Sequence, residues 1–210
     1  PPSPEQVRLC DEMGLMIQIE AFDMWEKPKV ENGYSKFFNQ WHQQDLRDMI
    51  RAFRNSPSVV MWSIGNEILE QSDKINGERI ANELAMICKQ EDPTRPTTAG
   101  FNYYPAPIKN GLASAIDLVG WNYKPRKYAE ITERHPNWII YGSETSSTVS
   151  SRGVYHLPIE KYELHESLQI TSYDIIGPPW AYPPDIEFES LENNPNNLGE
   201  FIWTGFDYLG

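Results

Sequence analysis

Two glutamates follow apolar runs that have the composition of buried strands. Glu67 ends the stretch VVMWSIGNE, directly after Asn66, and Glu144 ends the stretch WIIYGSE. If both strands belong to one parallel sheet, their carboxyl ends meet at the same mouth, and the two carboxylates can face each other across a substrate. Hydrolysis of a glycoside needs such a pair, one carboxyl to protonate the leaving oxygen and the other to attack or to activate water.

Each of these residues also has a simpler interpretation. A single glutamate after a strand is usually a first-turn helix carboxylate, favoured by the helix dipole. Trp62, Trp121 and Trp203 belong by default to the core, and Asp23 and Asp207 to caps or ion pairs. A shared site is favoured because polar or aromatic residues end so many apolar runs: Glu20, Asp23, Asn66, Glu67, Asn102, Asn122, Tyr123, Glu144, Trp203 and Asp207.

Strands and helices must alternate to hold these residues. Short apolar runs predict strands over 15–22, 58–64, 96–102, 116–123, 138–144 and 199–208. Amphipathic periodicity predicts a helix over 35–55, with one face formed by Phe38, Trp41, Leu46, Met49, Ile50 and Phe53. A second helix is predicted over 73–91, before Pro93, with an inward face of Ile75, Ile80, Leu84, Ile87 and Cys88.

Such alternation predicts βαβ units and a parallel sheet, either open and doubly wound or closed into a barrel. An open nucleotide-binding sheet should carry a glycine-rich strand-to-helix turn, and no turn of this sequence has that pattern. Polar residues at many strand ends favour the (β/α)8 TIM barrel, an α/β fold that builds its active site there. Six predicted strands fall short of eight, and residues 145–198 form one long connection, of the kind that usually lines or covers a site.

The composition limits the partners. The 210 residues carry 18 Lys and Arg against 30 Asp and Glu, a formal charge of −12, so a nucleic-acid partner is not expected. No apolar run approaches the roughly 20 residues that span a bilayer, so no membrane partner is expected either. The opening PPSPEQ has the character of the middle of a longer protein.

The two cysteines and four histidines suggest no metal centre. Cys10 and Cys88 each lie in a stretch with helical character, and two buried free thiols are the simpler interpretation, with one disulfide left open. None of His42, His135, His156 and His165 has zinc-ligand spacing or lies near a cysteine.

Five stretches of the sequence resemble blocks of one protein family, and they occur along the chain in the same order as in that family. RNSPSVVMWSIGNE resembles the acid/base segment of glycoside hydrolase family 2, the β-galactosidase and β-glucuronidase family. Four more blocks resemble the same family's barrel, so the likeness covers essentially the whole chain: LCDEMGLMIQIEAFDMW, WHQQDLRDMIRAFRN, IIYGSETSSTVSSRGVYH and GEFIWTGFDYLG.

The resemblance implies a role for each matching residue. Glu67 would be the general acid/base, Asn66 would hold the sugar 2-hydroxyl, and Glu144 would be the nucleophile. Tyr123 would donate a hydrogen bond to that nucleophile, and Trp203 would form a wall of the sugar subsite. Three further substrate-binding candidates come from strand ends, with roles at sugar hydroxyls or as support: Glu20, Asp23 and Asn122.

The resemblance also numbers the strands. The strand over 15–22 would be the barrel's third and the strand at 199–206 its eighth, so strands one and two are missing. Residues 1–210 would then form a partial TIM-barrel catalytic domain of a larger multidomain glycosidase, with flanking β-sandwich domains as partners. No cofactor is expected, and magnesium dependence is doubtful because AFDMWEKPK lacks the histidine of the magnesium-dependent β-galactosidases.

The expected activity is that of a retaining exo-β-glycosidase, a β-galactosidase that removes terminal β-linked sugars from an oligosaccharide or glycoside. The alternatives are a β-glucuronidase of the same family, whose clamp for the sugar carboxylate would lie beyond residue 210, or a non-catalytic sugar-binding or folding fragment. The sugar and linkage, a homo-oligomer, and a bacterial periplasmic, cell-surface or cytoplasmic location are left open by the sequence.

Overall fold

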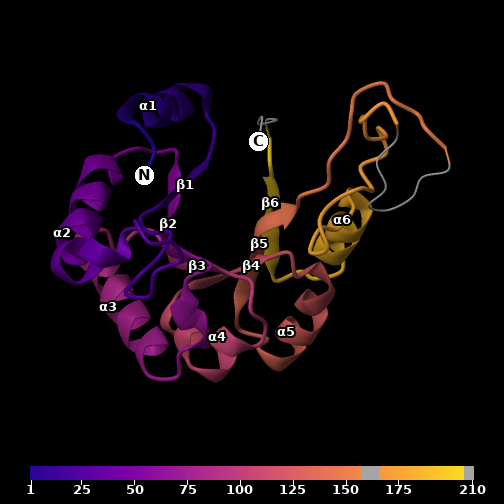
Figure 1. Cartoon of the computed structure of the whole chain (residues 1–210). Coiled ribbons are helices and arrows are strands. Elements are labelled where there is room, and N and C mark those ends of the chain that lie inside the picture. Colours follow the sequence, from indigo (N-terminus) through magenta and orange to yellow (C-terminus); the bar gives the residue numbers. More distant parts are fainter. Residues whose placement is uncertain (158–165, 206–210) are drawn as a thin grey trace. The chain divides into compact units, whose positions relative to one another are not determined.

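The computed structural model describes residues 1–157 and 166–205. Six parallel strands follow one another in sequence order, and helices occupy the connections, as in part of a (β/α)8 barrel (Figure 1). The strands are β1 (Ile17–Glu20), β2 (Val59–Asn66), β3 (Thr97–Phe101), β4 (Leu118–Asn122), β5 (Ile139–Ser146) and β6 (Asn197–Trp203). The chain divides into two compact units, Pro1–Gly120 and Trp121–Gly210.

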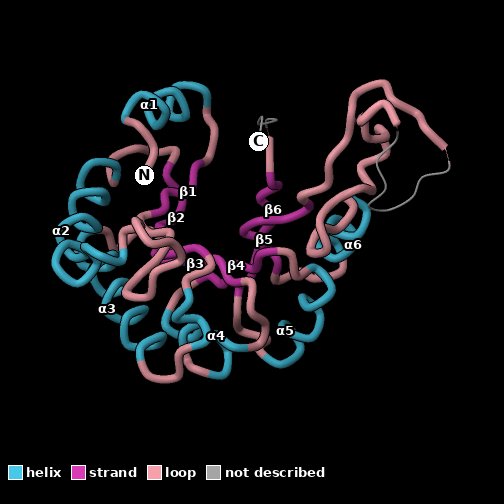
Figure 2. The backbone as a smooth tube through the Cα atoms, viewed as in Figure 1, coloured by secondary structure: helices cyan, strands magenta, loops and turns pink. Residues whose placement is uncertain are grey.

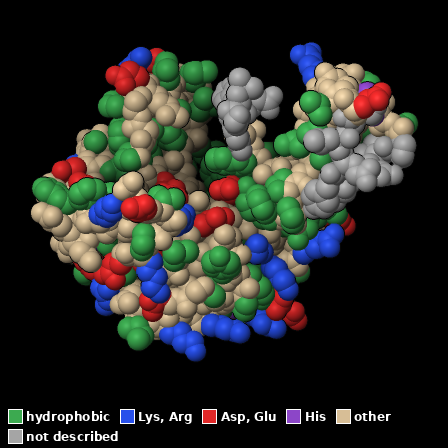
Figure 3. All heavy atoms as spheres, in the orientation of Figure 1, with side chains coloured by type: hydrophobic (Ala, Val, Ile, Leu, Met, Phe, Trp, Pro, Cys, Tyr) green, Lys and Arg blue, Asp and Glu red, His purple; other side chains and the backbone are tan. Residues whose placement is uncertain are grey.

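The first unit contains three long helices: α1 (Pro4–Met13), α2 (Ser35–Phe53) and α3 (Asn76–Glu91). Ser3 begins α1, because its hydroxyl accepts the Gln6 N–H at 3.2 Å. Gly14 ends the helix at a φ of +72°, a conformation that glycine adopts without steric cost. Figure 3 shows hydrophobic side chains on the surface at α1, where Met13 is 69% exposed.

The pairing of β1, β2 and β3 sets which residues end together. Ile17 pairs with Val59 at one end, and Glu20 pairs with Ser63 at the other. Asn66 of β2 pairs with Gly100 of β3. The strand ends that carry the predicted site residues in this unit are therefore neighbours.

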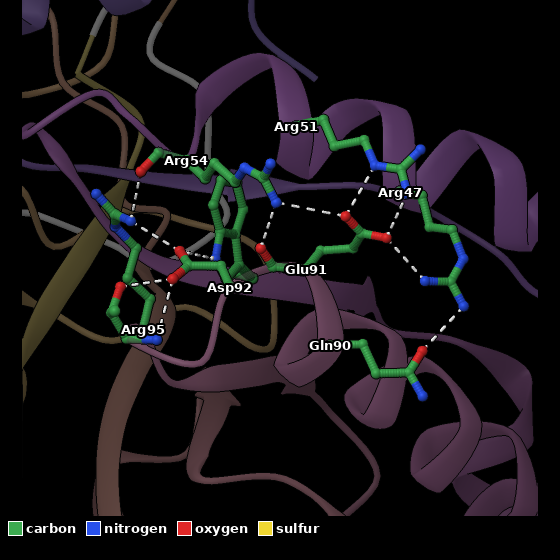
Figure 4. Close-up of polar contacts among 9 residues, drawn as sticks. Arg47, Arg51, Arg54, Gln90, Glu91, Asp92 and Arg95 are labelled. Atoms are coloured by element: carbon green, nitrogen blue, oxygen red, sulfur yellow. Dashed lines mark hydrogen bonds and ion pairs between the residues drawn. The ribbon is translucent and has the colours of Figure 1, made fainter.

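Ion pairs join α2 to α3 on the outside of the first unit. The Glu91 carboxylate receives Arg47 and Arg51 at 2.8 Å each and Arg54 at 3.5 Å (Figure 4). Hydrogen bonds from Arg51 and Arg47 lower the pKa of Glu91 to about 2. The neighbouring Asp92 accepts the Trp62 indole N–H at 3.0 Å, which links this network to β2.

The second unit contains α5 (Tyr128–Arg134) and α6 (Pro184–Glu192) beside β5 and β6. Gly142 of β5 pairs with Glu200 of β6, and Ser146 pairs with Trp203.

Shorter helical turns lie in both units. Those of the first unit are η1 (Leu69–Ser72), α4 (Ala106–Lys109) and η2 (Leu112–Ala115), and the second unit contains η3 (Pro125–Lys127). Over the described residues, no helix has the length and apolarity needed to cross a membrane.

Some sequence-based expectations need correction. Residues 145–198 are not a single loop, because α6 lies within them (Figure 2). The strand predicted to end at Glu144 continues to Ser146, and the last strand starts at Asn197 rather than at residue 199. It starts early because the Asn196 carbonyl already accepts the Ile140 N–H at 3.0 Å. Residues 206–208 of the predicted strand, including Asp207, lie outside the described residues.

Two predicted helix faces each contain one error. Trp41 is 45% exposed, because His42 takes the inward position, stacked on Phe38 and bonded to Glu83 at 2.9 Å. Ile75 is 80% exposed. It precedes the helix, because the Asp73 carboxylate caps the chain there by accepting the Ile75 N–H at 2.8 Å.

Both cysteines are free thiols. Cys88 is buried, as expected, and burial raises the pKa of its thiol to about 12. Cys10 is only half-buried, because its place on α1 leaves part of the side chain open to solvent.

Candidate active site

Glu67 follows β2 immediately, in the position predicted from the sequence. Its φ of +48° lies in the left-handed region, which turns the chain sharply where the strand ends. The Glu67 N–H donates to the Gly100 carbonyl at 2.8 Å, so the end of β3 holds the turn. Asn66 and Glu67 are both half-buried, so part of each residue is open to solvent.

Close packing behind the turn explains the glycine of the IGNE stretch. A Cβ on Gly65 would lie 3.0 Å from the Trp25 indole nitrogen and 3.0 Å from a methyl group of Ile68. The same indole N–H donates to the Ile64 carbonyl at 2.8 Å. Trp25 is fully buried, so β2 is fixed against a rigid group just before it delivers Asn66 and Glu67.

The segment after Glu67 is anchored to the end of β3 through Gln71. This buried side chain accepts the Asn102 and Tyr103 N–H groups at 3.1 Å each and donates to the Asn102 carboxamide oxygen at 2.7 Å. Asn102 was predicted as a strand-end residue, whereas Gln71 was missed. Nothing in the local sequence distinguishes Gln71 from an exposed glutamine.

Lys29 is a second residue that sequence reasoning missed. Its ammonium donates to the Asp23 carboxylate at 2.8 Å and to the Asn66 carbonyl at 2.7 Å. A positive charge therefore lies against the backbone one residue before Glu67, and Asp23 is paired with it. The EKPK stretch shows a cation near this strand end, but only the fold shows which carbonyl it contacts.

Glu20 is the last residue of β1 and is tied to the neighbouring strand. One of its carboxylate oxygens accepts the Ser63 hydroxyl at 2.6 Å. Ser63 is fully buried, so the bond fixes one side of the Glu20 carboxylate. The contact joins the end of β1 to β2, and the role of Glu20 at the substrate stays a prediction.

In the second unit, three predicted residues come together. The Tyr123 hydroxyl donates to Oε1 of Glu144 at 2.6 Å, and the Asn122 carboxamide donates to Oε2 at 3.5 Å. The Ser143 hydroxyl in turn donates to the Asn122 oxygen at 2.6 Å, which fixes the orientation of that amide. Both oxygens of Glu144 thus have donors from the end of β4.

Backbone geometry makes this cluster possible. Tyr123 follows β4 with a φ of +56°, and its N–H donates to the Glu144 carbonyl at 2.8 Å. Asn122 is fully buried, and Tyr123 is 7% exposed. Glu144 remains half-buried, so a ligand can still reach a carboxylate whose supporting groups are shielded from water.

Trp203 is the last residue of β6 and is 45% exposed. Its carbonyl accepts the Ser147 N–H at 3.0 Å, which joins it to the chain just beyond β5. Trp62 and Trp121, in contrast, are fully buried in the core. Trp203 is therefore the one of these three indoles with a face available to a ligand.

Two further carboxyl groups of the second unit, Glu187 on α6 and Glu200 on β6, have raised pKa values. Burial raises the pKa of Glu187 to about 7, and one of its oxygens accepts the Ser146 N–H at 3.0 Å. Burial, followed by the charge of Glu187, also raises the pKa of Glu200 to about 7. Sequence reasoning missed this pair, because burial of a carboxyl group depends on tertiary packing.

Within residues 1–157 and 166–205, no group of three or more His, Cys, Asp or Glu side chains is arranged to hold a metal ion. Beside Asn66, the ammonium of Lys29 provides the local positive charge.

Comparison with known proteins identifies the family. Residues 1–169 match the family model described as glycosyl hydrolases family 2, TIM barrel domain, and the chain belongs to that family. It is 32% identical to beta-galactosidase BoGH2A of Bacteroides ovatus over 100% of its length, and 29% identical to a beta-glucuronidase of Bacteroides fragilis over 95%. The structure of a glycosyl hydrolase family 2 member from Bacteroides cellulosilyticus superposes with a TM-score of 0.77 at 32% identity, covering 100% of this chain.

The chain spans less than a third of these relatives. It covers 29% of BoGH2A, 29% of the Bacteroides fragilis enzyme and 22% of the Bacteroides cellulosilyticus chain.

Proposed function

We propose that this chain is the catalytic barrel segment of a retaining exo-β-glycosidase, specifically a β-galactosidase. The observation that carries the proposal is the Glu144 carboxylate, which receives the Tyr123 hydroxyl at 2.6 Å and the Asn122 amide at the end of β4. Two donors from one neighbouring strand aim a carboxylate in a fixed direction, as a nucleophile requires. In the relatives, further sequence accompanies the matched segment, and we expect flanking β-sandwich domains.

In the proposed mechanism, Glu144 attacks the anomeric carbon of the terminal sugar and forms a covalent glycosyl-enzyme. Glu67, protonated, donates its proton to the departing glycosidic oxygen. Water then hydrolyses the intermediate, with Glu67 acting as the base. This sequence requires the two carboxyls to lie roughly 5–5.5 Å apart, and this separation stays a prediction.

The groups around Glu67 fit an acid/base residue. The turn at Glu67 is fixed by its N–H bond to Gly100, and Lys29 holds the preceding carbonyl. Asn66, beside it, would bind the sugar 2-hydroxyl through its amide. Trp203 would supply an apolar face against the C–H groups of the ring.

The direct test is a panel of aryl β-glycosides given to the whole natural protein. We expect hydrolysis of the β-galactoside with retention of configuration, measured by proton NMR of the first-formed sugar anomer. The Glu144→Gln variant serves as the matched control for background hydrolysis and should be inactive. First formation of the α-anomer, or activity that survives in Glu144→Gln, would contradict the proposal.

A β-glucuronidase is the second candidate, because several relatives bear that name, including the Bacteroides fragilis enzyme. It would use the same two glutamates but would need an additional group that binds a sugar carboxylate. The same panel separates the two, since it contains both the β-galactoside and the β-glucuronide. The charge of Asp174 in the pocket at the ends of β5 and β6 favours a neutral sugar.

A further inference from the structure

A pocket of about 420 Å³ opens in the second unit at the ends of β5 and β6. Its wall begins at Ser146, two residues beyond Glu144, and includes Trp203. Pockets for small molecules typically enclose roughly 300–1,000 Å³, so this one has room for a sugar-sized ligand. The pocket therefore includes Trp203, the residue proposed as a wall of the sugar subsite, and lies on the strand that carries Glu144.

The pocket has a hydroxyl-rich wall and an apolar wall. The apolar wall includes Trp203, Ile202 and Pro184. Hydroxyl groups both donate and accept hydrogen bonds, whereas the indole face packs against C–H groups. This combination suits a molecule with hydroxyls on its edge and C–H groups on its face. The hydroxyl-bearing residues that line the pocket are Ser146, Ser147, Thr148, Ser150 and Thr204.

Hydrogen bonds already fix the walls relative to each other. The Ser146 N–H donates to the Glu187 carboxylate of α6 at 3.0 Å, and the Ser147 N–H donates to the Trp203 carbonyl at 3.0 Å. Glu187 is 3% exposed, so the first bond is protected from water. A pocket held in this way loses little conformational freedom when a ligand enters.

Asp174 supplies the charge of the pocket. Among the described residues that line the pocket, Asp174 is the one with a charged side chain, and neither Lys nor Arg lies beside it in the wall. Its segment is attached to the wall through the antiparallel bridge between Val149 and Ile176, where the Val149 N–H donates at 2.7 Å. An aspartate accepts hydrogen bonds from sugar hydroxyls through two oxygens, but it repels a ligand carboxylate.

We propose that this pocket binds an uncharged, polyhydroxylated part of the substrate and that Asp174 is its specificity-determining residue. The Asp174 carboxylate accepts hydrogen bonds from hydroxyl groups of a neutral sugar, and its negative charge opposes binding of a uronic acid at the same place. The proposal rests on the proposed glycosidase function and adds to it the reason for preferring a neutral glycoside over a glucuronide.

The test compares Asp174→Asn with the unchanged whole protein. Asparagine is the appropriate replacement because Asp174 has a φ of +53°, which asparagine also tolerates, and because only the charge is lost. Asp185→Asn is the matched control, since Asp185 is an exposed aspartate on α6 that does not line the pocket. kcat/KM is measured for the aryl β-galactoside and for the aryl β-glucuronide.

We expect Asp174→Asn to lower kcat/KM for the neutral substrate by about 10–100-fold, the typical loss for a hydrogen bond to a charged group. The rate with the glucuronide should stay equal or rise, so the ratio of the two rates falls. Asp185→Asn should leave the ratio unchanged. An unchanged ratio in Asp174→Asn, or an equal fall in Asp185→Asn, would overturn the assignment of Asp174.

A binding experiment separates this proposal from the proposed function. Saturation-transfer NMR is recorded with methyl β-galactoside and methyl β-glucuronide on Glu144→Gln and on Glu144→Gln with Asp174→Asn. Loss of the galactoside signal in the double variant supports the pocket even if the whole protein hydrolyses neither substrate. Equal signals in both variants refute the pocket even if the galactoside is hydrolysed.

Discussion

At the scale of single residues, Tyr123 shows how backbone geometry serves the proposed chemistry. Its left-handed φ of +56° turns the chain after β4, and its hydroxyl reaches Oε1 of Glu144 at 2.6 Å. Glu67 has a left-handed φ as well. Residues other than glycine adopt this conformation at a cost, which the surrounding hydrogen bonds must offset.

Replacement of Tyr123 by Phe removes the hydroxyl and keeps the ring. We expect kcat for an aryl β-galactoside to fall about 10–100-fold, as for other hydrogen bonds to charged groups, with a smaller change in KM. The reason is that Glu144 loses the group that orients it for attack, whereas the sugar loses no direct contact. Steady-state kinetics measure both constants.

Tyr155→Phe is the control for that experiment, because this tyrosine is 66% exposed and lies outside the proposed site. It should behave like the unchanged protein. A Tyr123→Phe variant with full kcat, or one in which only KM rises, would show that the hydroxyl does not orient a nucleophile.

At the scale of elements, β5 and β6 depend on a specific pairing of a glycine with a glutamate. Gly142 lies opposite Glu200, and a Cβ at position 142 would come within 1.7 Å of the Glu200 carboxylate. The glycine therefore leaves space for the half-buried carboxyl group of Glu200 on the adjacent strand. Glu187 of α6 is close enough to raise the pKa of Glu200 further.

These carboxyls make the second unit less stable as the pH rises. The folded-state pKa of Glu187 is about 7, above the ordinary value of 4.5, so the folded state binds the proton more tightly. Stability is then highest below about pH 4.5 and declines until the pH exceeds about 7. We expect Glu187→Gln to reduce the pH-dependent loss in the free energy of unfolding by about 1–3 kcal/mol. The loss that remains in this variant is assigned to Glu200.

Hydrogen exchange of peptides from α6 and β6, recorded between about pH 5 and 8 and corrected for intrinsic exchange rates, measures this effect. Glu189→Gln is the control, because Glu189 is an exposed residue on the same helix. If the protection of the Glu187→Gln variant changes with pH as steeply as that of the unchanged protein, Glu187 does not have the assigned pKa.

The elements also show how far the sequence determines the fold. The apolar runs and the family resemblance predicted all six strands and the two longest helices, because buried parallel strands and amphipathic helices leave strong periodic signals. α6 was missed, because its proline-rich and acidic sequence lacks a regular apolar stripe. Lys29 and Gln71 were missed for another reason: each acts through contacts with distant backbone groups.

At the scale of the whole molecule, the proposed chemistry divides between the two units. Glu67, with Asn66 and Lys29, belongs to the first, and Glu144, with Tyr123 and Trp203, belongs to the second. Double displacement needs both carboxyls at one sugar, so the central claim is that Glu144 attacks the anomeric carbon of the same sugar whose glycosidic oxygen Glu67 protonates.

The measurement that tests this claim most directly is a dinitrophenol burst combined with intact-mass detection, on Glu67→Gln and Glu144→Gln of the whole protein. A dinitrophenyl β-galactoside scarcely needs a proton donor. Glu67→Gln should therefore show a burst and gain the mass of one hexosyl group, while disaccharide hydrolysis falls about 10²–10⁴-fold. Glu144→Gln should show neither the burst nor the added mass. A burst in Glu144→Gln but not in Glu67→Gln would reverse the two roles, and full activity in both variants would contradict the account.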